Sequence, residues 1–168
     1  MQNTSLSRTE KIIVALAAVG VVVMGYLIYV HYEKTGSTLC DLAPGFSCEV
    51  VNKSIYAEIF GVPVSVLGLA YFFSVIVLVA GRIRHGAKAI ELFTLGALVF
   101  SLYLTVVEVY LLGTICLFCE FSKVLMFIIL GVTHRASRRS GTPVPAKFHA
   151  AALVAGGVGT VVLHFIQR

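Results

Sequence analysis

Charged residues are scarce in this sequence, and tryptophan is absent. Of its 168 residues, 12% are Asp, Glu, Lys or Arg, whereas 58% are hydrophobic. A soluble domain carries roughly 25% charged residues, so the composition argues against a soluble protein. The hydrophobic residues are gathered into blocks, as in an integral membrane protein. Because tryptophan is missing, tyrosine and phenylalanine must form any aromatic belt at the membrane surfaces.

The sequence also lacks long polar segments and internal repeats. The connections between the apolar blocks are short, so we expect a single transmembrane domain over residues 1–168. The formal net charge of +5 could suggest a protein that binds nucleic acid. Its basic residues lie mostly in the short connections between blocks, which is typical of membrane topology signals and argues against a nucleic-acid partner.

Five apolar blocks are close to the ~20 residues that cross a bilayer as a helix. They are residues 12–30, 63–80, 90–112, 114–132 and 148–166. The first block follows Arg8 and Lys11 and could instead be a cleavable signal peptide. It is longer than the roughly 7–15 apolar residues of such peptides, and no small-x-small cleavage site follows it. We therefore expect an all-α integral membrane protein with five transmembrane helices.

The distribution of basic residues predicts the orientation of these helices. With five spans, nine Lys and Arg residues fall on one side of the membrane, and three fall on the other. The positive-inside rule puts the first side, with the N-terminus, in the cytoplasm. All four cysteines then lie at the outer face of the inner (plasma) membrane, where disulfides persist. The nine residues are Arg8, Lys11, Arg82, Arg84, Lys88, Arg135, Arg138, Arg139 and Lys147.

Two of the cysteines lie in the polar connection 31–53. A Pro44-Gly45 turn between Cys40 and Cys48 would bring the two thiols together. After this loop, the apolar pattern of residues 54–60 predicts a short amphipathic helix at the membrane interface, and Gly61 would end it.

The other two cysteines form a Cys-x-x-Cys motif, Cys116 and Cys119, at the start of the fourth block. A helix beginning near Thr114 would hold both sulfurs in or near its first turn. Free N–H groups and the positive end of the helix dipole stabilise thiolates there. This spacing is typical of a reversible disulfide.

Three interpretations of the four cysteines remain open at this point. Two structural disulfides are possible, although a Cys-x-x-Cys ring is too short to stabilise a fold well. A four-thiolate zinc site is disfavoured by the eight-residue step between Cys40 and Cys48 and by an oxidising compartment. In a redox relay, a soluble dithiol would reduce the loop pair, which would reduce the helix pair, which would reduce a membrane acceptor.

Short motifs run in order from residue 40 to residue 119. They are Cys40-Asp41-Leu42, Ser47-Cys48, Val51, Ser54, Tyr56-Ala57, Gly61-x-Pro63-x-Ser65, Gly68 and Cys116-x-x-Cys119. Together they resemble the vitamin K epoxide reductase family, most closely its bacterial branch. The resemblance implies four helices bundled around a quinone, with the cysteine loop and its short helix capping the pocket.

The resemblance also implies an activity. A thiol:quinone oxidoreductase of this kind reoxidises a thioredoxin-like partner of the DsbA type and reduces ubiquinone, menaquinone or a vitamin K quinone. By resemblance, Cys40 meets the partner, Cys48 relays electrons to Cys116, and Cys119 reduces the quinone. Ser54 would lie beside these cysteines, although it could instead be a plain helix N-cap.

Two departures from the family bear on these expectations. Many bacterial relatives carry a fused thioredoxin-like domain, whereas this sequence has none, so we expect the partner to be a separate protein. Animal relatives place a tyrosine one turn after the second helix cysteine, where this chain has Lys123. That difference argues against epoxide reduction.

We assign four residues to the quinone pocket as predictions: Ser65, Phe118, Lys123 and Glu108. Lys123 could instead form an ion pair with Glu120. Glu108 could pass protons to the quinone or lie at the outer interface. Two rival functions stay open, namely a warfarin-sensitive vitamin K epoxide reductase and a non-enzymatic membrane interaction protein stapled by disulfides.

Overall fold

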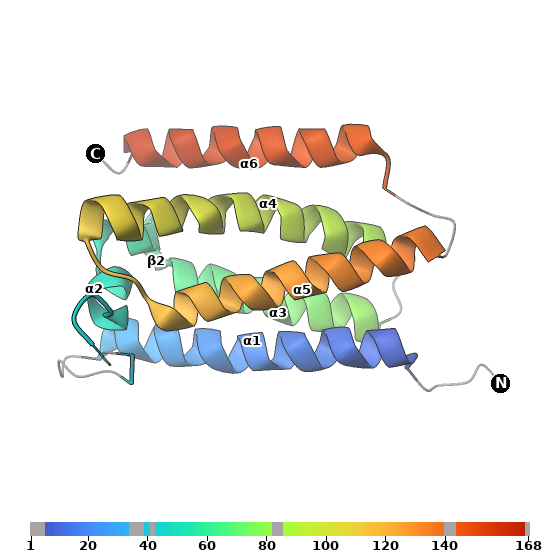
Figure 1. The fold of residues 1–168 in the computed structure, drawn as a ribbon, viewed down its shortest axis with the longest axis horizontal. Coiled ribbons are helices and arrows are strands. Elements are labelled where there is room, and N and C mark those ends of the chain that lie inside the picture. The colour runs from blue at the N-terminus through green and yellow to red at the C-terminus, as the bar shows by residue number, and fades with distance from the viewer. Residues whose placement is uncertain (1–5, 34–38, 41–42, 82–85, 140–143, 167–168) are drawn as a thin grey trace.

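Five long helices lie side by side in the computed structural model (Figure 1). The structure describes residues 6–33, 39–40, 43–81, 86–139 and 144–166, with side chains up to residue 162. The five predicted helical blocks are confirmed as helices, with shifted ends. The long helices are α1 (Arg8–Tyr32), α3 (Val64–Ala80), α4 (Gly86–Val107), α5 (Leu117–Arg139) and α6 (Ala146–Ile166).

Helix α1 begins four residues before the predicted apolar block because a capping box fixes its start. The Glu10 N–H donates to Ser7 Oγ at 3.3 Å, and the Ser7 N–H donates to the Glu10 carboxylate at 2.7 Å. Further along, α1 packs closely against α3. Gly20 makes this approach possible, since a Cβ there would lie 2.4 Å from the buried ring of Phe72.

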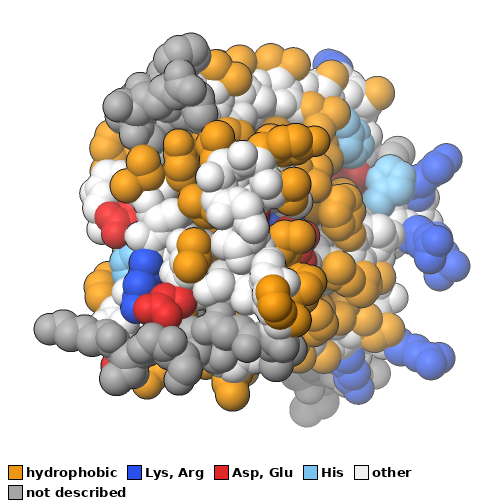
Figure 2. Space-filling model, turned by 60° about the vertical axis from the view of Figure 1, so that its left-hand side comes forward, with side chains coloured by type: hydrophobic (Ala, Val, Ile, Leu, Met, Phe, Trp, Pro, Cys, Tyr) orange, Lys and Arg blue, Asp and Glu red, His pale blue; other side chains and the backbone are white. Residues whose placement is uncertain are grey.

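The chain is an all-α membrane protein. Among the described residues, three helices are long and apolar enough to cross a membrane: α1, α4 with its continuation to Leu112, and α5. Helices α3 and α6 are apolar but shorter by this measure, so the count of five spans stays a prediction. Figure 2 shows many hydrophobic side chains on one face, most of the visible Lys and Arg side chains at one end, and a smaller group of basic and acidic side chains on the other side.

The connection from α4 to α5 differs from the prediction. The third block ends in a π-helical turn, Glu108–Leu112, and Gly113 reverses the chain with a φ of 65°. Helix α5 then begins at Leu117 and not near Thr114. The predicted start is wrong because the chain before Leu117 is extended and pairs with the cysteine loop. The Ile115 N–H donates to the Gly45 carbonyl at 3.0 Å.

The cysteine loop carries only short elements: α2 (Cys48–Asn52), the 3₁₀ turn η1 (Ile55–Ala57), and the strands β1 (Glu58–Ile59) and β2 (Val62–Pro63). The predicted amphipathic helix over 54–60 is therefore wrong. Phe60 and Gly61 both have positive φ, 52° and 76°, and form the turn of a small hairpin. The α-helical turn lies earlier, where Ser47 caps the N-terminus of α2.

Some predictions fall outside the described residues. They concern Asp41 and Leu42 of the first motif, and the charges of Lys34, Arg82, Arg84 and Arg168. The predicted orientation therefore rests partly on sequence alone.

Candidate redox site

Cys40 and Cys48 form a disulfide, with their Cα atoms 5.6 Å apart. Both are buried, and Cys48 is the first residue of α2. Helix α1 holds this loop at two points. The Leu39 N–H donates to the Tyr26 hydroxyl at 2.9 Å, and His31 Nδ1 lies 2.6 Å from the Asn52 carbonyl oxygen. The disulfide is thereby held beside the C-terminal end of α1, and Figure 1 shows α2, which begins at Cys48, at that end of the helix bundle.

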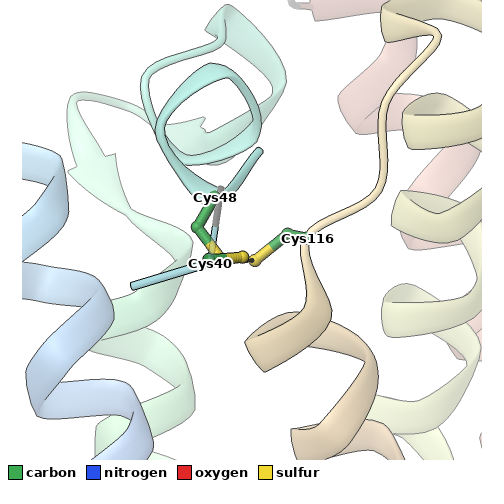
Figure 3. Close-up of side chains that lie close together, drawn as sticks. All are labelled: Cys40, Cys48 and Cys116. Atoms are coloured by element: carbon green, nitrogen blue, oxygen red, sulfur yellow. Dashed lines mark hydrogen bonds between the residues drawn. A yellow bond between two sulfur atoms is a disulfide. The ribbon is translucent and has the colours of Figure 1, made fainter. Parts of the chain in front are cut away.

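Backbone pairing brings the loop disulfide to the helix cysteines. Phe46 and Ile115 form a parallel bridge, and the Ser47 N–H donates to the Ile115 carbonyl at 3.2 Å. Since each bridge residue is followed closely by a cysteine, Cys48 Sγ lies 3.1 Å from Cys116 Sγ (Figure 3). The structure thus brings together three of the four cysteines that the sequence singled out.

Cys116 and Cys119 are free thiols on either side of the start of α5. The Cys119 N–H donates to Cys116 Sγ at 3.3 Å. One of the unpaired N–H groups of the helix start therefore faces the sulfur, as expected for a thiol that must ionise. Cys116 itself is wholly buried against the loop, whereas Cys119 is partly buried.

Asn52 is a site residue that the sequence analysis missed. Its side-chain Nδ2 donates to the Cys48 carbonyl at 3.0 Å and lies 3.7 Å from Cys116 Sγ and 3.9 Å from Cys119 Sγ. Asn52 follows Cys48 by four residues, so a helix through Cys48 would have placed the two on one face. That signal was hidden because the helix was expected further along the chain.

A buried charged cluster lies behind Cys116. Glu108 is 2% exposed, and its Oε2 accepts the Cys116 N–H at 3.0 Å. The π turn carries the Glu108 side chain into the interior of the bundle, and its depth in the membrane stays a prediction. The alternative for Lys123 is confirmed, since its Nζ lies 2.5 Å from Glu120 Oε1. Lys123 also donates to Thr105 and lies 3.9 Å from Glu108 Oε1.

A cavity of about 360 Å³ lies next to the cysteines, inside the bundle. Its walls are mostly apolar and come from α1, α3, α4, α5 and α6, so the last helix adds a wall that a four-helix pocket would lack. Its polar groups include six residues already discussed: Asn52, Ser54, Ser65, Glu108, Cys119 and Lys123. Cys119 lines the cavity, and Cys116 does not.

The predicted pocket residues are brought together with one exception. Ser65 is buried, and its Oγ has no hydrogen-bond partner among the described residues. Ser54 Oγ donates to the Val51 carbonyl at 2.8 Å and does not cap a helix through its side chain. Phe118 is the exception, because its ring packs edge-on against Tyr26, 5.1 Å between centroids, and does not line the cavity.

The cavity fits a quinone. A quinone ring is flat and apolar with two carbonyl oxygens, so it needs apolar walls and a few donors. The Lys123 ammonium, the Asn52 amide and the otherwise unpartnered Ser65 hydroxyl are such donors.

The model of the vitamin K epoxide reductase family matches residues 11–134. This chain belongs to that family. The match takes in all four cysteines and the helices from α1 to most of α5. Members of the vitamin K epoxide reductase family are oxidoreductases that act on thiols and on quinones or vitamin K, and this chain is an oxidoreductase of that kind. Helix α6 lies beyond the matched residues.

Proposed function

We propose that this protein is a thiol:quinone oxidoreductase that generates disulfides outside the cytoplasm. It takes two electrons from the dithiol of a separate thioredoxin-like or DsbA-like protein and passes them to a quinone in the membrane. The observation that carries the proposal is the 3.1 Å approach of Cys48 Sγ to Cys116 Sγ, with Cys119 facing the cavity.

The first step is thiol–disulfide exchange at the loop. A thiolate of the partner attacks Cys40 Sγ, the Cys40–Cys48 bond breaks, and Cys48 leaves as a thiolate. The second thiol of the partner then attacks the mixed disulfide. The partner leaves oxidised, and the loop holds two thiols. Because Cys40 is 1% exposed, residues 39–40 must move outward before the partner can reach the sulfur.

The second step transfers the electrons inward. The Cys48 thiolate attacks Cys116 of a Cys116–Cys119 disulfide and releases the Cys119 thiolate. Cys40 then attacks Cys48, which restores the loop disulfide and frees Cys116. The loop disulfide and the two free helix thiols of the structure correspond to the state after this step. The 3.1 Å contact supports this order, because exchange needs the two sulfurs to meet directly.

The third step regenerates the Cys116–Cys119 disulfide. A quinone bound in the cavity supplies the acceptor for two electrons and two protons. We assign Lys123, Asn52 and Ser65 to holding its carbonyl oxygens, and Glu108 with Lys123 to delivering protons. Lys123 Nζ lies 3.9 Å from Glu108 Oε1 and both residues line the cavity, which supports the assignment.

Anaerobic turnover tests the proposal. Purified protein in lipid nanodiscs is mixed with a reduced DsbA-like protein and ubiquinone or menaquinone, and quinone reduction is followed by absorbance. We expect turnover by the wild type and none by Cys119→Ala, which should still form a disulfide adduct with the partner through Cys40. No quinone reduction by the wild type would favour a stapled interaction protein. Reduction of vitamin K epoxide but of no quinone would favour the epoxide reductase.

A trapping experiment tests the order of the relay. The double variant Cys40→Ser, Cys119→Ser leaves Cys48 and Cys116, which should form a disulfide under mild oxidation. The matched control Cys40→Ser, Cys116→Ser leaves Cys48 with Cys119 and should crosslink more slowly. Equal rates, or no crosslink between Cys48 and Cys116, would show that the assigned order is wrong.

A further inference from the structure

Three side chains of the types that bind metal ions lie close together at the end of the bundle opposite the cysteines. They are Glu91 of α4, His134 of α5 and His149 of α6. Figure 1 shows that the start of α4, the end of α5 and the start of α6 lie at this end, and Figure 2 shows histidine side chains beside the Lys and Arg groups there. The relay from Cys40 to the cavity uses none of the three residues.

The ligand atoms of the three side chains converge on one point. His134 Nδ1 lies 2.7 Å and His149 Nε2 lies 2.6 Å from the same carboxylate oxygen, Glu91 Oε1. The two rings are 6.0 Å apart and inclined by 73°, so each presents one nitrogen to the carboxylate from a different direction. One ligand atom from each residue lies within 4.8 Å of the other two.

The carboxylate of Glu91 is short of positive partners. Its side chain is 0% exposed, and no described residue forms a hydrogen bond with its second oxygen, Oε2. No Lys or Arg among the described residues pairs with it. A buried carboxylate is costly unless a cation or several donors compensate its charge. The two imidazoles can compensate the charge of Glu91 by hydrogen bonding, and a bound metal ion could compensate it directly.

The residue types suit a transition metal. Two imidazoles and one carboxylate are a common ligand set for zinc, with water as the fourth ligand. Neighbouring ligand atoms in a tetrahedral zinc site are about 3.3 Å apart, so the two contacts of 2.6–2.7 Å would need to open by less than about 1 Å. The His134 and His149 side chains are 42% and 26% exposed, so an ion and a water ligand can reach the cluster.

We propose that Glu91, His134 and His149 form a binding site for a divalent first-row transition-metal ion, best suited to zinc. Each ligand comes from a different helix, so the ion would fasten α6 to both α4 and α5. His149 lies beyond residues 11–134 of the family match, so the complete ligand set belongs to this chain and not to the matched family region.

Zinc titration of the protein tests this site. The variant Cys116→Ser, Cys119→Ser keeps the loop disulfide and therefore has no free thiol that could bind zinc. It is purified with its affinity tag removed, stripped with a chelator and titrated by competition with a chromophoric chelator. We expect one zinc ion per chain, and Co²⁺ should give the visible absorption of a tetrahedral site.

Substitutions in the same background separate a metal site from a hydrogen-bonded cluster. His149→Gln keeps a hydrogen-bond donor for Glu91 but is a poor zinc ligand, so it should lower zinc affinity by at least about 100-fold. The control is His31→Ala. His31 lies in the last turn of α1, at the cysteine end of the bundle, so its loss should leave zinc affinity unchanged. The melting temperature without zinc shows whether His149→Gln is folded, and zinc should raise it only where the site is intact.

Two outcomes would overturn the proposal. One is no zinc binding in the background variant, which would leave the cluster as hydrogen bonds only. The other is zinc binding that His149→Gln and His134→Ala leave unchanged, which would place the ion elsewhere.

Discussion

Two buried polar side chains from other elements contact Cys116. Glu108 accepts its backbone N–H, and the Asn52 amide lies near its sulfur and that of Cys119. Neither contact follows from the local sequence pattern. Glu108 lies in the π-helical turn before Cys116, and Asn52 lies in α2, 64 residues earlier in the sequence. The sequence marked the four cysteines through their spacing, but it could not reveal the buried polar groups that contact them.

Asn52→Leu should slow electron transfer between the two cysteine pairs. The amide is a hydrogen-bond donor to sulfur, and leucine keeps much of the volume without the donor. A hydrogen bond to a charged group contributes about 1.5–3 kcal/mol, so we expect at least roughly a 10-fold loss of quinone reduction. The rate of thiol release at Cys119 after loop reduction checks the step. An unchanged rate in a folded variant would exclude a role for the amide.

Lys123→Met should slow quinone reduction by at least about 10-fold, because it removes a buried cationic donor beside the cavity. Exchange between the loop and the partner should stay nearly unchanged, since Cys40 and Cys48 do not contact Lys123 in the relay. Glu120→Gln is the matched control, because it breaks the ion pair and keeps the lysine. Full turnover in Lys123→Met, or equal losses in both variants, would show that the lysine serves only the ion pair.

At the scale of elements, the long helices were predictable and their junctions were not. Blocks of about 20 apolar residues identify helices, because the backbone N–H and C=O groups of a segment in lipid must form hydrogen bonds within that segment. The start of α5 and the hairpin at Phe60 and Gly61 depend on pairing and on positive φ, which the apolar pattern does not encode. The capping box at Ser7 and Glu10 was present in the sequence and extends α1 past its apolar block.

The packing of α1 against α3 can be tested with two glycines of the same helix. Gly20→Ala puts a Cβ against the buried Phe72 ring and should destabilise the protein by about 1–3 kcal/mol. Gly25→Ala meets nothing within 4 Å and should be neutral or stabilising, since alanine favours helix by about 1 kcal/mol. Thermal unfolding in detergent measures both. Similar losses in the two variants would contradict close packing at Gly20.

At the scale of the whole molecule, most described Lys and Arg residues belong to the starts of α1, α4 and α6 and the end of α5, at the end of the bundle opposite α2 and the cysteine loop (Figure 1). Lys53 and Lys123 are the described exceptions and lie at the cysteine end. This separation agrees with the predicted orientation, although part of the charge count lies outside the described residues. The contribution of α6 to the cavity was not predictable. The glycines of this apolar segment, Gly156, Gly157 and Gly159, favour close helix contact, but they do not show which surface they contact.

Labelling with a membrane-impermeant thiol reagent tests the orientation. In a variant whose only cysteine is Cys40, the reagent should label the Cys40 thiol in intact cells. Without Cys48 the loop disulfide cannot form, so this thiol is free to react. A cysteine introduced at exposed Arg139, in a cysteine-free chain, should react only after the membrane is opened. The reverse pattern would invert the topology and move the relay to the cytoplasm.

The contact between Cys48 and Cys116 has a kinetic consequence. The pair separates the loop, which a soluble protein can reach, from the cavity, which a lipid-soluble molecule can reach. One substrate can therefore leave before the other arrives, with the electrons stored meanwhile as thiols. Initial rates should follow a ping-pong pattern, with parallel lines in double-reciprocal plots at different quinone concentrations. An analogue of one substrate should inhibit competitively when that substrate is varied. It should not inhibit competitively when the other substrate is varied.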